Sequence, residues 1–171
     1  MTYYAVVDTN VVVSALLKEQ SNPHKILDYI ESGIIKPLYN EYILNEYYEV
    51  LTRNKFGFDE EIVLKNISLI KLSGIELERT KVDELFLDED DIVFYEIVMT
   101  SRVKDNEDAK LITGNIKHYP KKEFVVTPTE MIEIIERDLE LEKKLDNRNQ
   151  VKNVNMLKNA ISLFINSKIV L

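Results

Sequence analysis

The sequence predicts an α/β fold in which a mainly parallel sheet is covered by helices on both faces. Short apolar runs rich in β-branched and aromatic residues, such as residues 3–7 and 110–113, alternate along the chain with segments of helical periodicity. Because strands and helices alternate throughout, parallel strands joined by crossover helices are favoured. The 171 residues, 45% hydrophobic and 30% charged, are enough for a globular domain with a full core.

Helix and strand signals follow one another clearly in the first half of the chain. After residues 3–7, a short helix is expected over 11–17, and Ser21 or Asn22 begins another that ends at Gly33. A strand over 34–39 contains Pro37, which suggests an edge position or a bulge.

Two further helices follow that strand. Asn40 caps a helix that runs to about Arg53, and residues 59–73 form the next helix, with Gly74 as its stop. In the first of these, the helical spacing places at least one of Tyr47 and Tyr48 in the core.

The second half of the chain continues the alternation and ends in a distinct tail. Residues 75–79, 110–113 and 123–126 read as strands, and Thr127 to Glu130 form a capping box that opens a helix to about Leu145. The polar residues 146–153 suggest a break. We therefore predict a domain over 1–146 and a C-terminal helical extension over 147–171.

The tail is expected to form an amphipathic helix. Its apolar residues have helical spacing: Val154, Leu157, Ile161 and Phe164. No acidic residue follows Asp146, so the charges of the tail are all positive. The helix could pack on the domain, pair with a second copy or bind an acidic segment of a partner. A direct role in RNA binding ranks behind these, because four dispersed charges neutralise little phosphate.

Composition narrows the classes of function. The absence of cysteine excludes disulfides and thiolate metal sites and suits a reducing cytoplasm. The sequence contains neither a signal peptide pattern nor an apolar run of membrane-spanning length, so no membrane partner is expected. The net charge of −8 opposes attraction of nucleic acid over the whole surface. A local basic patch or an acidic metal site remains compatible with it.

Acidic residues stand where ligands bind in this class of fold. Asp8 directly follows the first strand, and ligands of open α/β sheets bind outside the carboxyl ends of the strands. The alternative is that Asp8 only caps the next helix. The run from Asp88 to Asp91 precedes the helix that starts near Ile92, where acids also complement the helix dipole.

A third acid can join this group. Glu46 lies on the helix that follows the second strand, beside its apolar stripe. If right-handed crossovers bring these carboxylates to one edge of the sheet, they repel each other unless a cation is present. Hard oxygen ligands suit Mg²⁺ or Mn²⁺, which can activate water for phosphodiester hydrolysis. The residues alone do not establish that the acids meet.

Five segments, in this order and spacing, resemble the PIN-domain family, in the branch assigned as toxins of toxin–antitoxin pairs. The segments are residues 7–16, 43–51, 88–94, 111–120 and 125–128, and the resemblance spans about Tyr3 to Ile135. It implies a three-layer α/β/α sandwich with a mainly parallel sheet of about five strands. It also implies an Mg²⁺- or Mn²⁺-dependent endoribonuclease for single-stranded RNA, with an antitoxin protein as partner and a homodimer as the expected assembly.

The resemblance also assigns roles to individual residues. The three acids of the family match Asp8, Glu46 and Asp91, with Asp90 as a further metal ligand and Glu49 as a substitute for Glu46. Four polar residues are expected beside the metal or the substrate: Thr9, Asn10, Asn115 and His118. Asn115 departs from the family pattern, because many members carry an acid there. An amide oxygen can ligate a hard cation but brings no charge, so a second metal would bind less tightly.

Two functions stay open at this point. The first is the metal-dependent ribonuclease, which the three matching acids favour. The second is a catalytically degraded module on the same fold that binds RNA or protein, which Asn115 and the net charge of −8 favour. Retention of acids at three separate places is hard to explain by helix capping alone, so the ribonuclease is preferred.

Overall fold

The computed structural model describes residues 1–83, 86, 91–104 and 108–168, and it contains a five-stranded sheet in which all strands are parallel. The strand order is β3-β2-β1-β4-β5. The strands are β1 (Tyr3–Val7), β2 (Ile35–Tyr39), β3 (Ile75–Glu76), β4 (Lys110–Ile112) and β5 (Val125–Val126). The predicted α/β fold with a parallel sheet is therefore confirmed.

In the described ranges, six α-helices and a short 3₁₀ helix connect and follow these strands. They are α1 (Thr9–Leu17), α2 (Asn22–Glu31), α3 (Glu41–Leu51), α4 (Glu60–Ser73), α5 (Ile92–Lys104), η1 (Ile116–His118) and α6 (Pro128–Lys168). The caps expected from the sequence are present, since the side chains of Asp8, Ser21 and Asn40 accept backbone N–H groups at the starts of α1, α2 and α3. Local sequence thus fixes where these helices begin.

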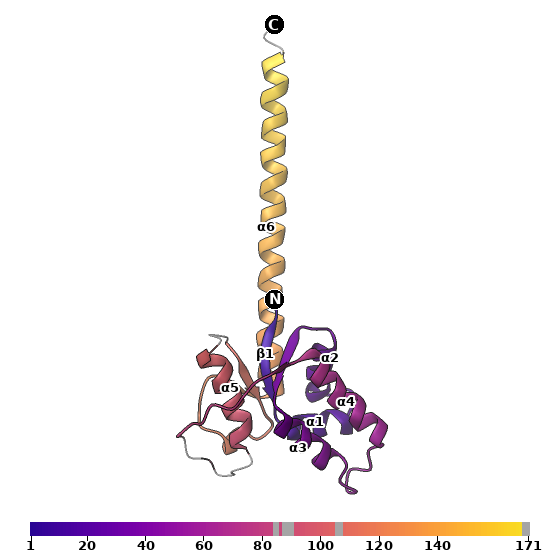
Figure 1. The fold of residues 1–171 in the computed structure, drawn as a ribbon. Helices are drawn as coiled ribbons and strands as arrows, with labels where there is room; N and C mark the ends of the chain where they lie inside the picture. The colour runs from indigo at the N-terminus through magenta and orange to yellow at the C-terminus, as the bar shows by residue number, and fades with distance from the viewer. Residues whose placement is uncertain (84–85, 87–90, 105–107, 169–171) are drawn as a thin grey trace. The chain divides into compact units, whose positions relative to one another are not determined.

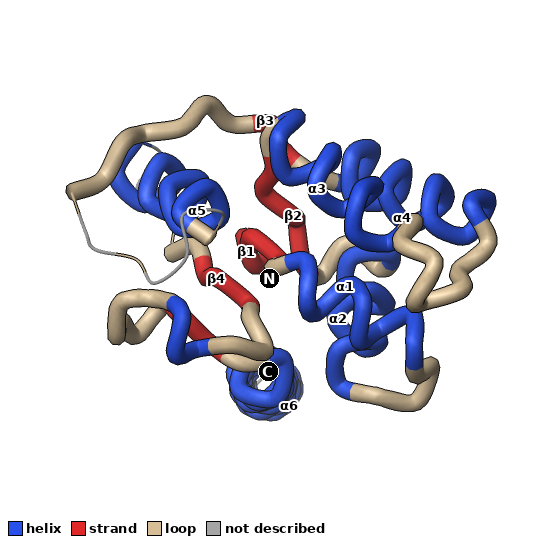
Figure 2. The backbone as a smooth tube through the Cα atoms, turned by 90° about the horizontal axis from the view of Figure 1, so that it is seen from below, coloured by secondary structure: helices blue, strands red, loops and turns tan. Residues whose placement is uncertain are grey.

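Helices lie on both faces of the central strands (Figure 2). Helix α5 packs on β1, β2 and β4, whereas α2 packs on β2 from the side that also holds α1. The strand β1 is central, and its residues Ala5 to Val7 are fully buried. This burial on both faces explains why β1 is a continuous apolar run. The chain leaves the sheet at the carboxyl end of β1, directly into Asp8.

The edge position expected for Pro37 is wrong. Strand β2 lies inside the sheet, between β3 and β1, and Pro37 pairs with Ala5. Strand β3 pairs only with Leu38 and Tyr39, so Pro37 lies just before the β2–β3 ladder begins. A proline lacks a backbone N–H. Because β3 does not reach Pro37, no hydrogen bond between β2 and β3 is lost there.

The break expected over residues 146–153 is also wrong. Helix α6 runs without interruption from Pro128 to Lys168, drawn in orange to yellow in Figure 1. Its capping box forms as expected, because the Glu130 carboxylate accepts the Thr127 N–H at 2.7 Å and the Thr127 hydroxyl accepts the Glu130 N–H at 3.2 Å. Asparagine lowers helix propensity only modestly, so a polar run without Gly or Pro does not end a helix.

The chain divides into two compact units, Met1–Ile132 and Glu133–Leu171. The predicted boundary at residue 146 lies within α6 and stays a prediction. In the second unit, five large apolar side chains among the described residues are exposed: Leu141, Leu145, Val154, Met156 and Leu157. No helix within the described ranges combines the length and apolar character that crossing a membrane requires.

We expect that removal of residues 147–171 leaves the first unit folded, because the buried apolar side chains of the described residues all lie between Ala5 and Ile135. Circular dichroism should lose helical signal while a single cooperative melting transition remains within a few degrees of that of the full chain. Sedimentation of both proteins tests the tail as an interaction helix, since the full chain should then self-associate and the shortened chain should not. Aggregation or loss of the cooperative transition on truncation would mean that the tail belongs to the core.

Candidate functional site

Asp8 caps α1 and also holds a buried carboxylate at the carboxyl end of β1. Its Oδ1 accepts the Asn10 N–H at 3.1 Å, and its Oδ2 accepts the hydroxyls of Thr113 at 2.7 Å and Tyr119 at 3.0 Å. Only 4% of Asp8 is exposed. A cap uses only one of these oxygens, and the other is bound by two hydroxyls from the far half of the chain.

Tyr119 brings Asp91 to the same place. The Tyr119 hydroxyl lies 3.0 Å from Asp8 Oδ2 and 3.4 Å from Asp91 Oδ1, so the sum of these distances is an upper bound on the separation of the two carboxylate oxygens. A phenol carries one proton and can donate it to only one acceptor at a time. On its other side, Asp91 Oδ2 lies 2.9 Å from Nδ1 of His118. Two of the three predicted acids therefore meet.

Glu46 reaches this group through Thr9. The Thr9 hydroxyl donates to Glu46 Oε1 at 2.6 Å, and Thr9 directly follows Asp8. Glu46 and Asp91 also line one pocket of about 520 Å³ on the side of α3. Tyr47, the residue after Glu46, is buried, as expected for at least one of Tyr47 and Tyr48. Its hydroxyl donates to the Val7 carbonyl. The third acid thus borders the site without a direct bond to Asp8.

The side chain of Asn10 holds the turn after β4. Its Nδ2 donates to the Thr113 hydroxyl at 3.3 Å, and its Oδ1 accepts the Gly114 N–H at 2.8 Å. A Cβ at Gly114 would lie 2.9 Å from Asn10 Oδ1, so a larger residue there would displace the Asn10 amide from its bond to the Gly114 N–H. The next residue, Asn115, donates its backbone N–H to the Thr113 hydroxyl at 2.9 Å, and it lines a second pocket along η1.

Burial and charge act on the tyrosine between the acids. Burial first, and then the negative charges of Asp8 and Asp91, raise the pKa of Tyr119 far above its ordinary value of 10.0. The pKa of Tyr47 is raised in the same direction, by burial first and then by Asp8 and Glu46. Both phenols therefore stay protonated donors at any pH at which the protein is folded.

The same residues decide whether a metal ion fits this site. Within the described ranges, no group of three or more His, Asp or Glu side chains is arranged to hold a metal ion. Asp90, predicted as a further ligand, lies outside the described residues. What the described residues provide is a pair of carboxylates, Asp8 and Asp91, on either side of one hydroxyl. Hard oxygens of this kind match the donor preference of Mg²⁺ and Mn²⁺.

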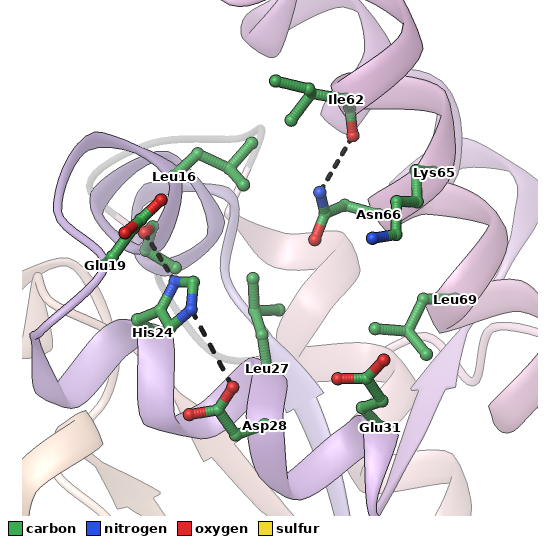
Figure 3. A pocket seen from close by; sticks show the side chains of 11 residues that line it. Leu16, Glu19, His24, Leu27, Asp28, Glu31, Ile62, Lys65, Asn66 and Leu69 are labelled. Atoms are coloured by element: carbon green, nitrogen blue, oxygen red, sulfur yellow. Dashed lines mark hydrogen bonds and ion pairs between the residues drawn. The ribbon is translucent and has the colours of Figure 1, made fainter.

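A separate pocket of about 360 Å³ lies among α1, α2 and α4 (Figure 3). His24 lies there between the Ala15 carbonyl, 3.0 Å from Nδ1, and Asp28, 3.8 Å from Nε2. Lys65 and Asn66 face the same space from α4. None of the predicted site residues lines this pocket, so its side chains can serve as matched controls.

Sequence reasoning missed the residues that connect the acids. Thr113 and Tyr119 both donate to Asp8, yet no spacing rule marks a hydroxyl that follows a strand or a turn. It also missed an ion pair in which the buried Glu96 on α5 accepts from the partly exposed Arg79 at 2.6 Å. The only signal for Glu96 was an acid within an otherwise apolar helix segment. This pair fixes the chain before α5, the helix that begins beside Asp91.

Comparison with known families gives one match. A family model described as PIN domain matches residues 4–128, which is well over half of the chain and includes every described residue of the acid network. No curated protein matches the chain.

Titration of the tyrosines tests the buried site. Tyr47 and Tyr119 should be among the tyrosines that stay protonated in the ultraviolet difference spectrum up to the pH at which the protein unfolds. Because the folded pKa is raised above the unfolded value, their contribution to stability is complete below about pH 10 and is lost above it. Tyr119→Phe should reduce the number of tyrosines that ionise only on unfolding by one. In guanidinium chloride all nine tyrosines should ionise near pH 10. The same behaviour in the folded protein would contradict the burial of Tyr119.

Proposed function

The chain belongs to the PIN-domain family, and on that premise we propose that it is an Mg²⁺- or Mn²⁺-dependent endoribonuclease that hydrolyses single-stranded RNA. PIN domains are generally nucleases and typically use divalent metals. The observation that carries the proposal is the meeting of Asp8 and Asp91 around the Tyr119 hydroxyl, at the carboxyl end of the central strand. A bound cation would stabilise two carboxylates placed this close together, because without it they repel each other.

We assign the metal to Asp8, Glu46 and Asp91, with Asp90 as a candidate for a further ligand. When bound, such an ion supplies an activated water and offsets the charge that develops on the phosphoryl group. The protein keeps its acids oriented for this role. Thr9 holds the Glu46 carboxylate at 2.6 Å, and His118 holds Asp91 at 2.9 Å. These bonds keep the acids in place while substrate arrives.

His118 has a second possible contact. Its side chain is 43% exposed, and Nδ1 is engaged by Asp91, so the other ring nitrogen is the one that can face substrate. With Nδ1 donating to the Asp91 carboxylate, only the protonated imidazole can donate a second hydrogen bond, from Nε2, to a phosphate oxygen. We assign His118 to the substrate side of the site, together with Asn115 on the same turn.

For the biological role, we propose the toxin of a type II toxin–antitoxin pair, cytoplasmic and homodimeric. The support is the sequence resemblance and the charge of the tail, since every charged side chain after Asp146 is basic. Leu141, Leu145 and Leu157 are exposed on α6 and would be covered by a second copy or by an antitoxin.

One observation favours the second candidate, a binding module without catalysis. Within the part of the chain that the structure describes, three acids do not form one metal-holding group. Such a module would bind RNA or protein in chelator as well as in Mn²⁺ and would leave RNA intact. Metal-dependent cleavage of single-stranded RNA by the purified chain separates the two candidates.

Asp8→Asn should abolish cleavage without unfolding the protein. Asparagine caps helices as well as aspartate does, and its amide can still bond the neighbouring hydroxyls. We expect a melting temperature without metal that is equal or higher, because a like charge beside Asp91 is removed. Single-turnover cleavage with Mn²⁺ should fall by more than about a hundredfold. Asp28→Asn, in the pocket of Figure 3, is the control and should cleave normally. Undiminished cleavage by Asp8→Asn would remove Asp8 from the reaction.

Asn115→Asp should tighten metal binding. The residue lies one backbone hydrogen bond from Thr113, which donates to Asp8, so an added carboxylate would enter the same group of charges. Added charge increases the attraction for a divalent ion. Calorimetric titration with Mn²⁺ measures the effect, with Asn66→Asp as a control at the separate pocket. Equal or weaker affinity in Asn115→Asp would place this side chain outside the coordination sphere.

A further inference from the structure

Two pockets lie on either side of the contact between Asp91 and His118. The first, of about 520 Å³, lies along α3 and includes Glu46 and Asp91 in its lining. The second, of about 370 Å³, follows η1 and includes Asn115 and His118. Because Asp91 Oδ2 and His118 Nδ1 are only 2.9 Å apart, the two pockets adjoin at this contact.

Each pocket contains one side chain that is positively charged at neutral pH. Arg53 lines the pocket along α3, and Lys117 lines the pocket along η1. Both are exposed, and neither forms an ion pair with another described residue. In a protein with a net charge of −8, two cations that border an acidic site are a local exception. They supply the attraction for a polyanion that the acids and the overall charge oppose.

The pocket along α3 also presents an aromatic ring. Tyr42 is 45% exposed and lies in the lining with Arg53. An exposed ring beside a guanidinium is the combination on which unpaired bases stack while their phosphates are bound. The bases of a duplex are already stacked inside the helix, so they cannot use this ring.

We propose that Arg53 and Lys117 bind phosphates on opposite sides of the cleaved bond and that Tyr42 stacks a base. A single strand then runs from the pocket along α3, past Asp91, to the pocket along η1. The proposal rests on the nuclease function proposed for the same acids, and it names the strand's path and the residues that hold it. These three are positioning residues, which act on binding rather than on the chemical step.

Charge-removing variants of the full chain test the two phosphate contacts. Arg53→Gln and Lys117→Gln are compared with Lys65→Gln, a control in the pocket of Figure 3. Fluorescence anisotropy of a fluorescein-labelled single-stranded RNA is measured in EDTA at several salt concentrations. Each site variant should weaken binding by about two- to fivefold. Each should also reduce the slope of log affinity against log salt by about 0.7, whereas the control should match the wild type.

A pair of tyrosine variants tests the stacking contact. Tyr42→Leu keeps an apolar side chain but removes the ring, and it should weaken binding of the strand by at least about fivefold. Tyr48→Leu is the matched control. Tyr48 is 39% exposed on the same helix but donates to Glu60 at 2.7 Å and does not line the pocket. Equal binding by the two variants would overturn the assignment of Tyr42.

Single-turnover cleavage with Mn²⁺ separates positioning from chemistry. Arg53→Gln, Lys117→Gln and Tyr42→Leu should raise the protein concentration that gives the half-maximal rate and leave the maximal rate near that of the wild type. A fall in the maximal rate alone would overturn a positioning role. A duplex that competes for binding as well as an unlabelled single strand would overturn the single-strand path.

Different results would contradict the nuclease function and the strand path. A wild-type chain that neither binds nor cleaves RNA with Mg²⁺ or Mn²⁺ contradicts the nuclease function, and the strand path with it. A wild-type chain that cleaves RNA, while all three variants bind and cleave like their controls, overturns the strand path alone and leaves the nuclease function standing.

Discussion

Two carboxylates around one phenolic hydroxyl are the constraint on which the site depends. Asp8 directly follows β1 and Asp91 directly precedes α5. The Tyr119 hydroxyl lies between their carboxylates. Like charges in a buried setting repel strongly unless each has its own stabilising partners. Asp8 has the α1 backbone and Thr113, whereas Asp91 has His118. Each acid therefore has its own hydrogen-bond partners besides the Tyr119 hydroxyl that lies between them.

The sheet enforces this proximity. Val7 of β1 pairs with Ile112 of β4, and the Asp8 N–H donates to the Ile112 carbonyl at 2.9 Å. Parallel pairing makes both strands end at the same edge, so Asp8 and Thr113 leave the sheet side by side. Asn10 then ties the following turn to α1, and glycine at position 114 permits the approach. The path of the chain toward Tyr119 is thus set by backbone pairing and one small residue.

The sequence allowed prediction of features that depend on local chemistry. The apolar run of β1, the caps Asp8 and Asn40 and the Thr127 capping box all read correctly, because each depends on neighbours within four residues. Pro37 and the polar run after Asp146 were misread, since the length of β3 decides the first and no Gly or Pro interrupts the second. The roles of Thr113 and Tyr119 could not be predicted. They depend on contacts across more than a hundred residues of sequence separation.

Helix α3 carries a core residue, Tyr47, directly next to a site residue, Glu46. Tyr47 is buried on α3, and its hydroxyl donates to the carbonyl of Val7, the last residue of β1. This bond fixes α3 at the end of the strand from which Asp8 emerges. The preceding residue, Glu46, lies about 100° around the helix, on the adjacent face, where Thr9 reaches its carboxylate. Because burial first, and then Asp8 and Glu46, raise the Tyr47 pKa, the phenol remains a donor beside these acids. Packing of Tyr47 in the core and orientation of Glu46 therefore both depend on how α3 lies against the end of β1.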